Sequence, residues 1–198
     1  MAIGQTIHKI KGAFVSRMKP KVFVALNISI LTVSKKLDIT NDTAGELLQS
    51  RLLQAGHKLH SRTVLPANKY SIRALVANLI ASDDVQVILI SGGTGLTEDD
   101  ITPEAIEIMF DKHVEGFGEL FRHCSLSQIG YATLQSRATA GLANQTLIVA
   151  MPSSPNACET AWDTILSHQL DAGQKPCNFV ANLKSVPVVL CPSRETNK

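Results

Sequence analysis

The chain has 198 residues, of which 44% are hydrophobic and 18% are charged, and this composition is typical of one globular domain with a substantial core. Nineteen Lys and Arg residues against 17 Asp and Glu residues leave a formal net charge of +2, which is too small to predict a nucleic-acid partner. No apolar run approaches the roughly 20 residues that a membrane-spanning helix needs, so we expect a soluble, cytoplasmic protein with no membrane contact.

Basic charge is concentrated at the start of the chain. No acidic residue precedes Asp38, and the basic residues before it are Lys9, Lys11, Arg17, Lys19, Lys21, Lys35 and Lys36. Such a start is compatible with an organellar targeting peptide or with an exposed arm. We expect a basic arm over residues 1–26, because the tract is short and carries no clear cleavage signal.

Four apolar segments are predicted to be strands, and their residues are 27–34, 58–66, 85–91 and 146–151. The last two read VQVILIS and TLIVAM, near-continuous apolar runs that are typical of parallel strands covered on both faces. The second segment is less apolar and ends at Pro66, as an edge strand can.

Helical patterns alternate with these strands over residues 43–55, 69–82, 102–112, 118–126 and 155–170. Asn68 and Ser154 are expected to cap two of the helices, and Thr102 to cap a third, with its hydroxyl group. We expect the helix after Thr102 to run to about Lys112 and a break at Gly116–Gly118 to precede the next one.

The order β-α-β-α-β-α-α-β-α predicts a three-layer α/β/α sandwich with a mostly parallel sheet. We assign the α/β domain to residues 27–183 and a C-terminal tail to residues 184–198. The segment from Asp171 onward is expected to pack on the body or on a partner subunit.

Neither the cysteines nor the histidines predict a metal site. The chain has no CxxC spacing and no His at zinc-ligand distance from a Cys, so we expect reduced thiols. His57 and His60, in the stretch HKLH, are expected to form an exposed surface pair.

Three loops follow the predicted strands at 27–34, 85–91 and 146–151, at the sheet edge where ligands bind in such folds. The middle loop contains SGGTGLTEDD. Its residues Gly92, Gly93 and Gly95 allow close approach of the backbone to a ligand. The loop lacks the GK[ST] ending of a P-loop and the GxGxxG spacing of a dinucleotide-binding turn, so a purely structural turn is an alternative.

Three acidic residues follow the glycines, namely Glu98, Asp99 and Asp100. Carboxylate and phosphate repel each other, but a magnesium ion binds through one or two carboxylates together with the phosphate oxygens of a nucleotide. The tract therefore predicts a metal–phosphate ligand. The alternative is that Asp99 and Asp100 only favour the positive end of the following helix.

Four motifs occur in fixed order between about Asn27 and Leu183, and they read SGGTGLTEDDITPEA, VEGFGELFR, TLQSRATAG and LIVAMPSSPNAC. Together they resemble the molybdopterin-binding family of molybdenum cofactor biosynthesis, which includes the molybdopterin adenylyltransferases. The resemblance implies a three-layer α/β fold, a homo-oligomer (trimer or hexamer), and the use of Mg²⁺ and ATP to adenylylate molybdopterin, leaving pyrophosphate.

The resemblance also implies roles for the residues that match these motifs. Asp100 is implied to be the catalytic carboxylate and, with Asp99, a metal ligand. The positions implied to contact the phosphates or the pterin are Ser34, Asp42, Gly92, Gly93, Thr94, Gly95, Glu119, Ser136, Arg137, Pro152 and Ser153.

The chain departs from the family pattern in three places. Active adenylyltransferases carry an acid after the second strand, where this chain has Ala67 and Asn68. Ser153 replaces a loop glycine, and Glu98 and Asp99 stand where active members tend to have an Ala-Arg type pair. Two hypotheses therefore stay open: a molybdopterin adenylyltransferase, and a non-catalytic pterin-binding or scaffolding oligomer of the same pathway.

Overall fold

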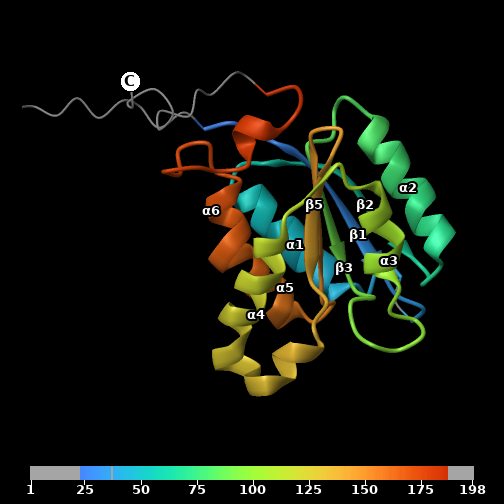
Figure 1. Cartoon of the computed structure of the whole chain (residues 1–198). Helices are drawn as coiled ribbons and strands as arrows, with labels where there is room; N and C mark the ends of the chain where they lie inside the picture. Colours follow the sequence, from blue (N-terminus) through green and yellow to red (C-terminus); the bar gives the residue numbers. More distant parts are fainter. Residues whose placement is uncertain (1–22, 37, 187–198) are drawn as a thin grey trace, which may run out of the picture.

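A computed structural model describes residues 23–36 and 38–186 of the chain. This part of the chain folds into one six-stranded sheet with helices on both faces (Figure 1), which confirms the predicted three-layer α/β/α sandwich. Most of the predicted basic arm, up to residue 22, and the end of the tail, from residue 187, lie outside the described residues.

The order of the strands in the sheet is β2-β1-β3-β6-β5-β4. Their bounds are β1 Asn27–Val33, β2 Lys58–Leu65, β3 Val87–Ser91, β4 Lys112–His113, β5 Thr139–Ala143 and β6 Thr146–Met151. β1 pairs in parallel with β2 and β3, and β3 pairs in parallel with β6, whereas β5 runs antiparallel to both β6 and β4. The sheet is therefore mostly parallel, and β2 forms its edge, as the proline at its end predicted.

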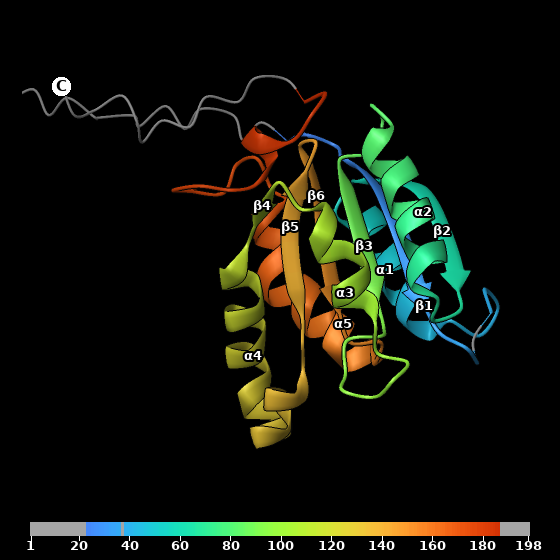
Figure 2. The same cartoon turned by 45° about the vertical axis from the view of Figure 1, so that its right-hand side comes forward.

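Two groups of helices cover the two faces of the sheet (Figures 1 and 2). The helices α1, α4, α5 and α6 lie on one face, and α2 and α3 lie on the other. Their bounds are α1 Thr43–Gln54, α2 Lys69–Ala81, α3 Thr102–Ile106, α4 Glu115–Ile129, α5 Pro155–Ala161 and α6 Ser167–Gln169, with a π-helical turn, Trp162–Leu166, between the last two. Short 3₁₀ turns are η1 Glu107–Met109, η2 Gly130–Gln135 and η4 Val180–Asn182.

The central strands bury both of their faces. In β3, Val87 and Leu89 lie in the core under α1, α4 and α5, whereas Ile88 and Ile90 lie in the core under α2 and α3. All four side chains are fully buried. Successive residues of a strand point to opposite faces, so a strand between two helical layers is mostly apolar on both of its faces.

The third predicted helix is shorter than expected. α3 ends at Ile106, and Lys112 lies in β4, so the prediction of a helix as far as Lys112 is wrong. The backbone beyond Ile106 pairs with β5 instead: Asp111 N donates to the Leu142 carbonyl at 2.8 Å. The tertiary pairing therefore replaces the hydrogen bonds that would have continued the helix.

The predicted break at Gly116–Gly118 is also wrong, because α4 begins at Glu115 and contains both glycines. Gly118 has a packing role. A Cβ atom at this position would lie 2.4 Å from the carbonyl oxygen of Ala138, so only glycine lets α4 approach the chain before β5 so closely.

The sequence did not predict the antiparallel strand β5, which reads TAGLA. Alanine and glycine have low strand propensity, so the segment carries little local signal. A two-residue turn joins β5 to β6, and Asn144 (φ 45°) and Gln145 (φ 58°) both adopt the left-handed backbone that such tight hairpins require.

The described part of the segment after Asp171 packs on the body, which is one of the two arrangements predicted for it. Val180 and Leu183 are buried in the core under α1, α4 and α5. Among the described residues, no helix is long and apolar enough to cross a membrane.

His57 is buried, so the predicted surface pair is wrong for this residue, although His60 is exposed. Its Nδ1 accepts a hydrogen bond from Leu26 N at 3.3 Å, and its ring lies 5.4 Å from the ring of Phe23 and 6.3 Å from that of Trp162. Burial lowers the pKa of His57 below its ordinary value, and the charge of Asp171 acts in the opposite direction without reversing the shift.

The lowered pKa of His57 predicts a loss of stability in mild acid. Below pH of about 6.5 the unfolded chain takes up a proton at this position that the folded chain does not, so the free energy of unfolding falls as the pH decreases towards the folded pKa. We expect His57→Gln to flatten this part of a urea-unfolding profile, whereas His60→Gln, the exposed control, keeps the slope. Equal slopes in the parent and His57→Gln would contradict the prediction.

Candidate functional site

The three predicted ligand loops meet at the carboxyl end of the parallel strands, and the loop after β3 lies there beside the start of α5 (Figure 2). Gly92 is their point of contact. Its N–H donates to the Met151 carbonyl at 2.9 Å, and an added Cβ would lie 2.4 Å from the Val33 carbonyl oxygen and 3.4 Å from the Cβ of Ser153. The backbone of Gly92 also has φ +96°, so the position requires glycine on two grounds.

The loop after β3, residues 92–101 and here called the glycine loop, is held by its carbonyl groups. The carbonyls of Gly92 and Gly93 accept from Thr102, from its hydroxyl at 2.7 Å and its N–H at 2.9 Å. The carbonyls of Thr94 and Gly95 accept from Arg137, from its N–H at 2.9 Å and its Nε at 2.7 Å. Four consecutive carbonyl groups are therefore fixed to the body of the protein.

This arrangement determines where the amides point. The carbonyl oxygen and the N–H of a trans peptide unit point in opposite directions, so the N–H groups of Gly93, Thr94, Gly95 and Leu96 point away from the groups that hold the carbonyls. We call these four groups the amide row. Within residues 23–36 and 38–186, the N–H groups of Gly93, Thr94 and Leu96 donate to no other group. The Gly95 N–H lies on the Asp100 carboxylate, and the free amides on either side of it are donors of the kind that bind an anion such as phosphate.

Thr102 has a different role from the one predicted. The residue that precedes the helix is Ile101, and no side chain caps α3. The Thr102 hydroxyl instead closes the glycine loop at Gly92, and it is fully buried. By contrast, Asn68 and Ser154 cap α2 and α5 as predicted, with side-chain oxygens that accept from backbone N–H groups of the first helical turn.

Asp100 lies at the end of the glycine loop with its carboxylate turned towards the loop's own amides. Oδ2 accepts from the Thr97 N–H at 2.9 Å and from the Thr97 hydroxyl at 2.6 Å. Burial would raise the pKa of Asp100, but hydrogen bonds from Thr97 and Gly95 outweigh it and hold the pKa below its usual value. The group is therefore a carboxylate at neutral pH, half-buried and adjacent to the amide row.

Asp99, the second implied metal ligand, is exposed and forms an ion pair with Lys35 of the first loop. Sequence analysis assigned no role to Lys35. The two residues are 64 positions apart, and only the fold brings the loops after β1 and β3 together. The pair places a cation beside the acidic tract of the glycine loop.

Asp42 is enclosed by protein groups. Its carboxylate caps α1 by accepting from Gly45 N at 2.9 Å, and it accepts from the Thr32 hydroxyl at 2.9 Å and from Arg62 at 3.1 Å. Thr32 is in turn within 3.0 Å of the Ser91 hydroxyl at the end of β3. Asp42, implied to contact the ligand, thus connects β1 and β3 near their carboxyl ends with Arg62 of β2.

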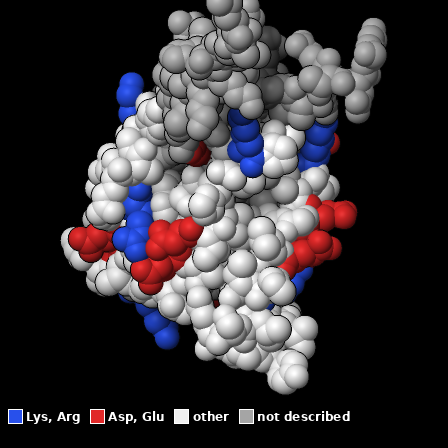
Figure 3. All heavy atoms as spheres, turned by 90° about the vertical axis from the view of Figure 1, so that its left-hand side faces the viewer, with Lys and Arg blue, Asp and Glu red and all other residues white. Residues whose placement is uncertain are grey.

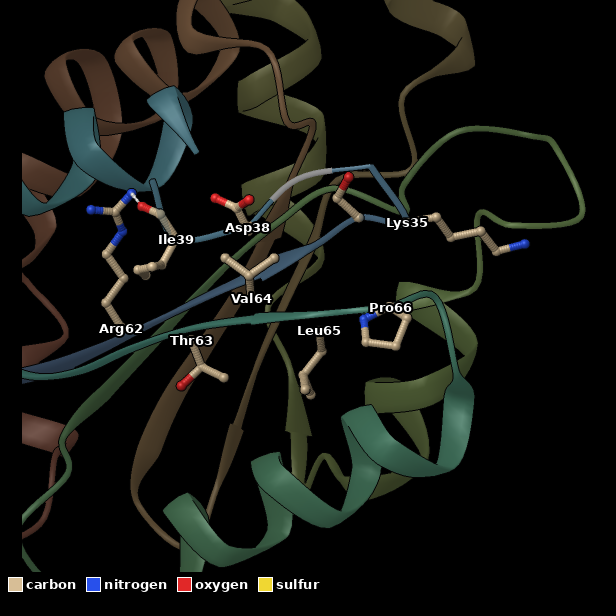
Figure 4. Close-up of a pocket in the computed structure, with 9 residues that line it drawn as sticks. Lys35, Asp38, Ile39, Arg62, Thr63, Val64, Leu65 and Pro66 are labelled. Atoms are coloured by element: carbon tan, nitrogen blue, oxygen red, sulfur yellow. Dashed lines mark hydrogen bonds between the residues drawn. The ribbon is translucent and has the colours of Figure 1, made fainter. Parts of the chain in front are cut away.

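An open depression of about 470 Å³ lies between the first loop and the end of β2 (Figure 4). The residues that line it are Ser34, Lys35, Asp38, Ile39, Arg62, Thr63, Val64, Leu65 and Pro66. Ser34 therefore lies at a cavity beside the glycine loop, and the Lys35 side chain points out of the cavity towards that loop. The depression is large enough to accommodate part of a nucleotide or a pterin.

The other implied positions fall into two groups. Pro152 is half-buried and Ser153 is exposed in the loop after β6, next to Gly92. Ser136 precedes Arg137, and its Oγ is the one buried side-chain polar atom among the described residues that has no hydrogen-bond partner. Glu119 is exposed on α4, and the structure joins it to the glycine loop by no contact within the described residues.

The donor groups fit a magnesium ion that is bound together with a phosphate ligand. Among the described residues, no three His, Cys, Asp or Glu side chains are close enough together to hold a metal ion by themselves. Magnesium commonly uses one or two carboxylates and takes its other ligands from water and phosphate. Asp100, charged and beside the amide row, provides such a carboxylate.

A family model described as a probable molybdopterin binding domain matches residues 29–172. Molybdenum cofactor biosynthesis protein B of Escherichia coli strain K12 is 54% identical over 162 residues, which are 82% of this chain and 95% of that protein. A probable molybdopterin adenylyltransferase of Methanocaldococcus jannaschii is 36% identical over 121 residues, 61% of this chain and 71% of that protein.

A solved structure is similar to the same region. The crystal structure of a molybdenum cofactor biosynthesis protein B superposes with a TM-score of 0.73 at 35% sequence identity, covering 75% of this chain and 93% of that chain. The similarity therefore covers three quarters of the chain.

Proposed function

The chain belongs to the molybdopterin-binding family of molybdenum cofactor biosynthesis, and from this premise we propose that it binds molybdopterin or a phosphorylated relative in the cytoplasm and adenylylates it with Mg-ATP. The observation that carries the proposal is the amide row beside the Asp100 carboxylate. Amides attract a polyphosphate, and a carboxylate next to them is compatible with that charge only when a cation lies between the two.

The residues of this chain have distinct tasks in such a transfer. The reaction joins a phosphate oxygen of the pterin to the α-phosphorus of ATP and releases pyrophosphate. The amide row donates hydrogen bonds to phosphate oxygens, where negative charge shifts as the bonds exchange. Magnesium, when bound at Asp100, supplies neutralisation of the polyphosphate. Lys35, which is held next to the loop by Asp99, adds an exposed cation beside the amide row.

A specific observation favours the alternative of a non-catalytic pterin-binding or scaffolding protein. Active adenylyltransferases carry an acid after the second strand, and this chain has the methyl group of Ala67 and the amide of Asn68. The Asn68 side chain is engaged in capping α2, where it accepts from the N–H groups of Tyr70 and Ser71. Loss of one carboxylate near the metal weakens catalysis more than binding.

We also propose that the chain forms a homo-oligomer, a trimer or hexamer, through α4 and η2. Residues 123–136 contain no Lys, Arg, Asp or Glu. Five of the large apolar side chains in these two elements are exposed, namely Leu120, Leu126, Ile129, Tyr131 and Leu134. The lower part of the face in Figure 3 shows the resulting absence of charge. A contiguous exposed apolar surface is typical of an interface between protein chains.

Binding of the polyphosphate is expected to depend on magnesium and on Asp100. In calorimetry, Mg-ATP should bind to the parent, and a chelator or Asp100→Asn should weaken binding by roughly ten-fold or more, because the carboxylate interaction with the metal is lost. Asp84→Asn, at the opposite end of β3, is the matched control and should bind as the parent does. Unchanged affinity in the presence of chelator would rule out a metal–phosphate ligand.

Restoring an acid after β2 is expected to raise adenylyl transfer. We expect Ala67→Asp or Asn68→Asp to increase pyrophosphate release from molybdopterin and Mg-ATP by roughly ten-fold or more over the parent. Asn68→Asp keeps the oxygen that caps α2, and Ala67→Asn provides a side chain of the same size without charge. If neither acidic variant exceeds the parent, the missing acid does not limit catalysis, and rapid release by the parent itself would exclude the non-catalytic alternative.

Charge on the apolar surface of η2 is expected to break the oligomer. The double variant Tyr131→Glu/Leu134→Glu should have the mass of a single chain in light scattering coupled to size exclusion, because two buried carboxylates cost more than the interface gains. Tyr70→Glu, an exposed tyrosine on α2, is the control and should keep the parent's mass. An unchanged mass for the double variant would place the interface elsewhere.

A further inference from the structure

Arg137 uses every nitrogen of its side chain to hold the glycine loop and the helix after it. Nε donates to the Gly95 carbonyl at 2.7 Å, Nη2 donates to the Asp100 carbonyl, and Nη1 donates to the carboxylate of Glu104. The backbone N–H of Arg137 also donates a hydrogen bond to the Thr94 carbonyl. Each nitrogen of the guanidinium therefore has a protein acceptor, and three of its five N–H groups are used in this way.

The two backbone carbonyls that the Arg137 side chain binds, those of Gly95 and Asp100, lie at the two ends of one exposed loop segment. The segment Leu96–Asp100 leaves the body at Gly95 and returns at Asp100, and it is exposed between these points. One planar, rigid group bonded to both ends fixes their separation. The amide row ends at Leu96, next to the first carbonyl, and the carboxylate belongs to Asp100, the residue of the second, so this separation also limits the spacing between the row and the carboxylate.

We propose that Arg137 is a positioning residue that does not contact the ligand itself, and that it fixes the spacing between the amide row and the Asp100 carboxylate that a metal-bound polyphosphate requires. The binding part of this inference rests on the proposed function. It differs from the role that resemblance implied for Arg137, which was a direct contact with phosphate through its charge.

The two roles predict different behaviour for a lysine at this position. A direct phosphate contact depends mainly on positive charge, which Arg137→Lys keeps. A positioning role depends on several donors in a fixed planar arrangement, which a single ammonium group does not reproduce. Arg137→Lys should then fail almost as badly as Arg137→Gln. Glu104→Gln, which weakens only one of the contacts, should have a smaller effect in the same direction.

The first measurement is amide hydrogen exchange of the free, full-length protein by NMR. The N–H groups of residues 102 and 137 donate to the carbonyls of Gly93 and Thr94, so their exchange rates report on the order of the loop. We expect Arg137→Lys to accelerate exchange at both positions by roughly ten-fold or more. Leu147 N, which donates to the Gln86 carbonyl at 2.9 Å, is the internal reference and should not change.

The second measurement is calorimetry of the same variants with Mg-ATP. We expect both Arg137 variants to lose roughly ten-fold or more in affinity and to lose most of the difference that magnesium makes. Arg73→Lys is the matched control. Arg73 also binds two carbonyls through its guanidinium, at 2.9 and 3.1 Å, but these belong to Glu104 and Ala105 of α3, so its variant should exchange and bind as the parent does.

Unchanged exchange at residues 102 and 137 in Arg137→Lys would overturn the proposal. So would accelerated exchange with parent-like affinity, because the order of the loop would then not matter to the ligand. A parent that does not bind Mg-ATP would overturn the proposed function instead, and the exchange rates would still decide whether Arg137 orders the loop.

Discussion

A trans peptide unit points its carbonyl oxygen and its N–H in opposite directions, and this constraint determines what the glycine loop offers to a ligand. Thr102 and Arg137 bind the carbonyls of residues 92–95, so the following amides face the other way. The proposed binding surface is therefore formed by residues on the far side of the loop, which need not touch the ligand. Gly92 is required for a different reason, because three loops meet there with no room for a Cβ atom.

Two of the three acids of the loop, Asp99 and Asp100, have their charge balanced by a cation or held by hydrogen bonds. Asp99 pairs with Lys35 of another loop, so an anion beside the proposed phosphate site is accompanied by a cation. Asp100 is kept charged by hydrogen bonds from its own loop, which suits the metal-binding role that we propose for it. Asp42 has a structural task, since removal of a buried carboxylate paired with Arg62 would leave the guanidinium uncompensated.

The sequence predicted the parts of this fold whose signal is local. The apolar runs of β3 and β6, the caps at Asn68 and Ser154, and the glycine loop at a strand end were all readable from neighbouring residues. Features that depend on contacts between residues far apart in the sequence could not be predicted in this way. The TAGLA segment is a strand because it pairs with β6. The ring of His57 lies against that of Trp162, which is more than 100 residues away in the sequence.

The site residues follow the same division. The glycines and Asp100 carry a motif, whereas Lys35 has no local pattern that predicts its pairing with Asp99. Thr102 was recognised as a hydroxyl before a proline, a pattern typical of a helix cap, but its hydroxyl binds a carbonyl ten residues earlier in the chain. Local chemistry identified the residue, and only the three-dimensional arrangement identified the partner.

The antiparallel direction of β5 affects which residues can lie at the carboxyl end of the parallel strands. A parallel strand can deliver to the ligand edge only the residues that come after it. The antiparallel strand β5 begins at the same edge, because its first residue, Thr139, is opposite Ala150 near the end of β6. The residues that precede β5 in the sequence therefore also lie at that edge. One inverted strand thus provides a second source of side chains, drawn from upstream sequence, and Arg137, two residues before β5, is a member of it that binds the loop leaving β3.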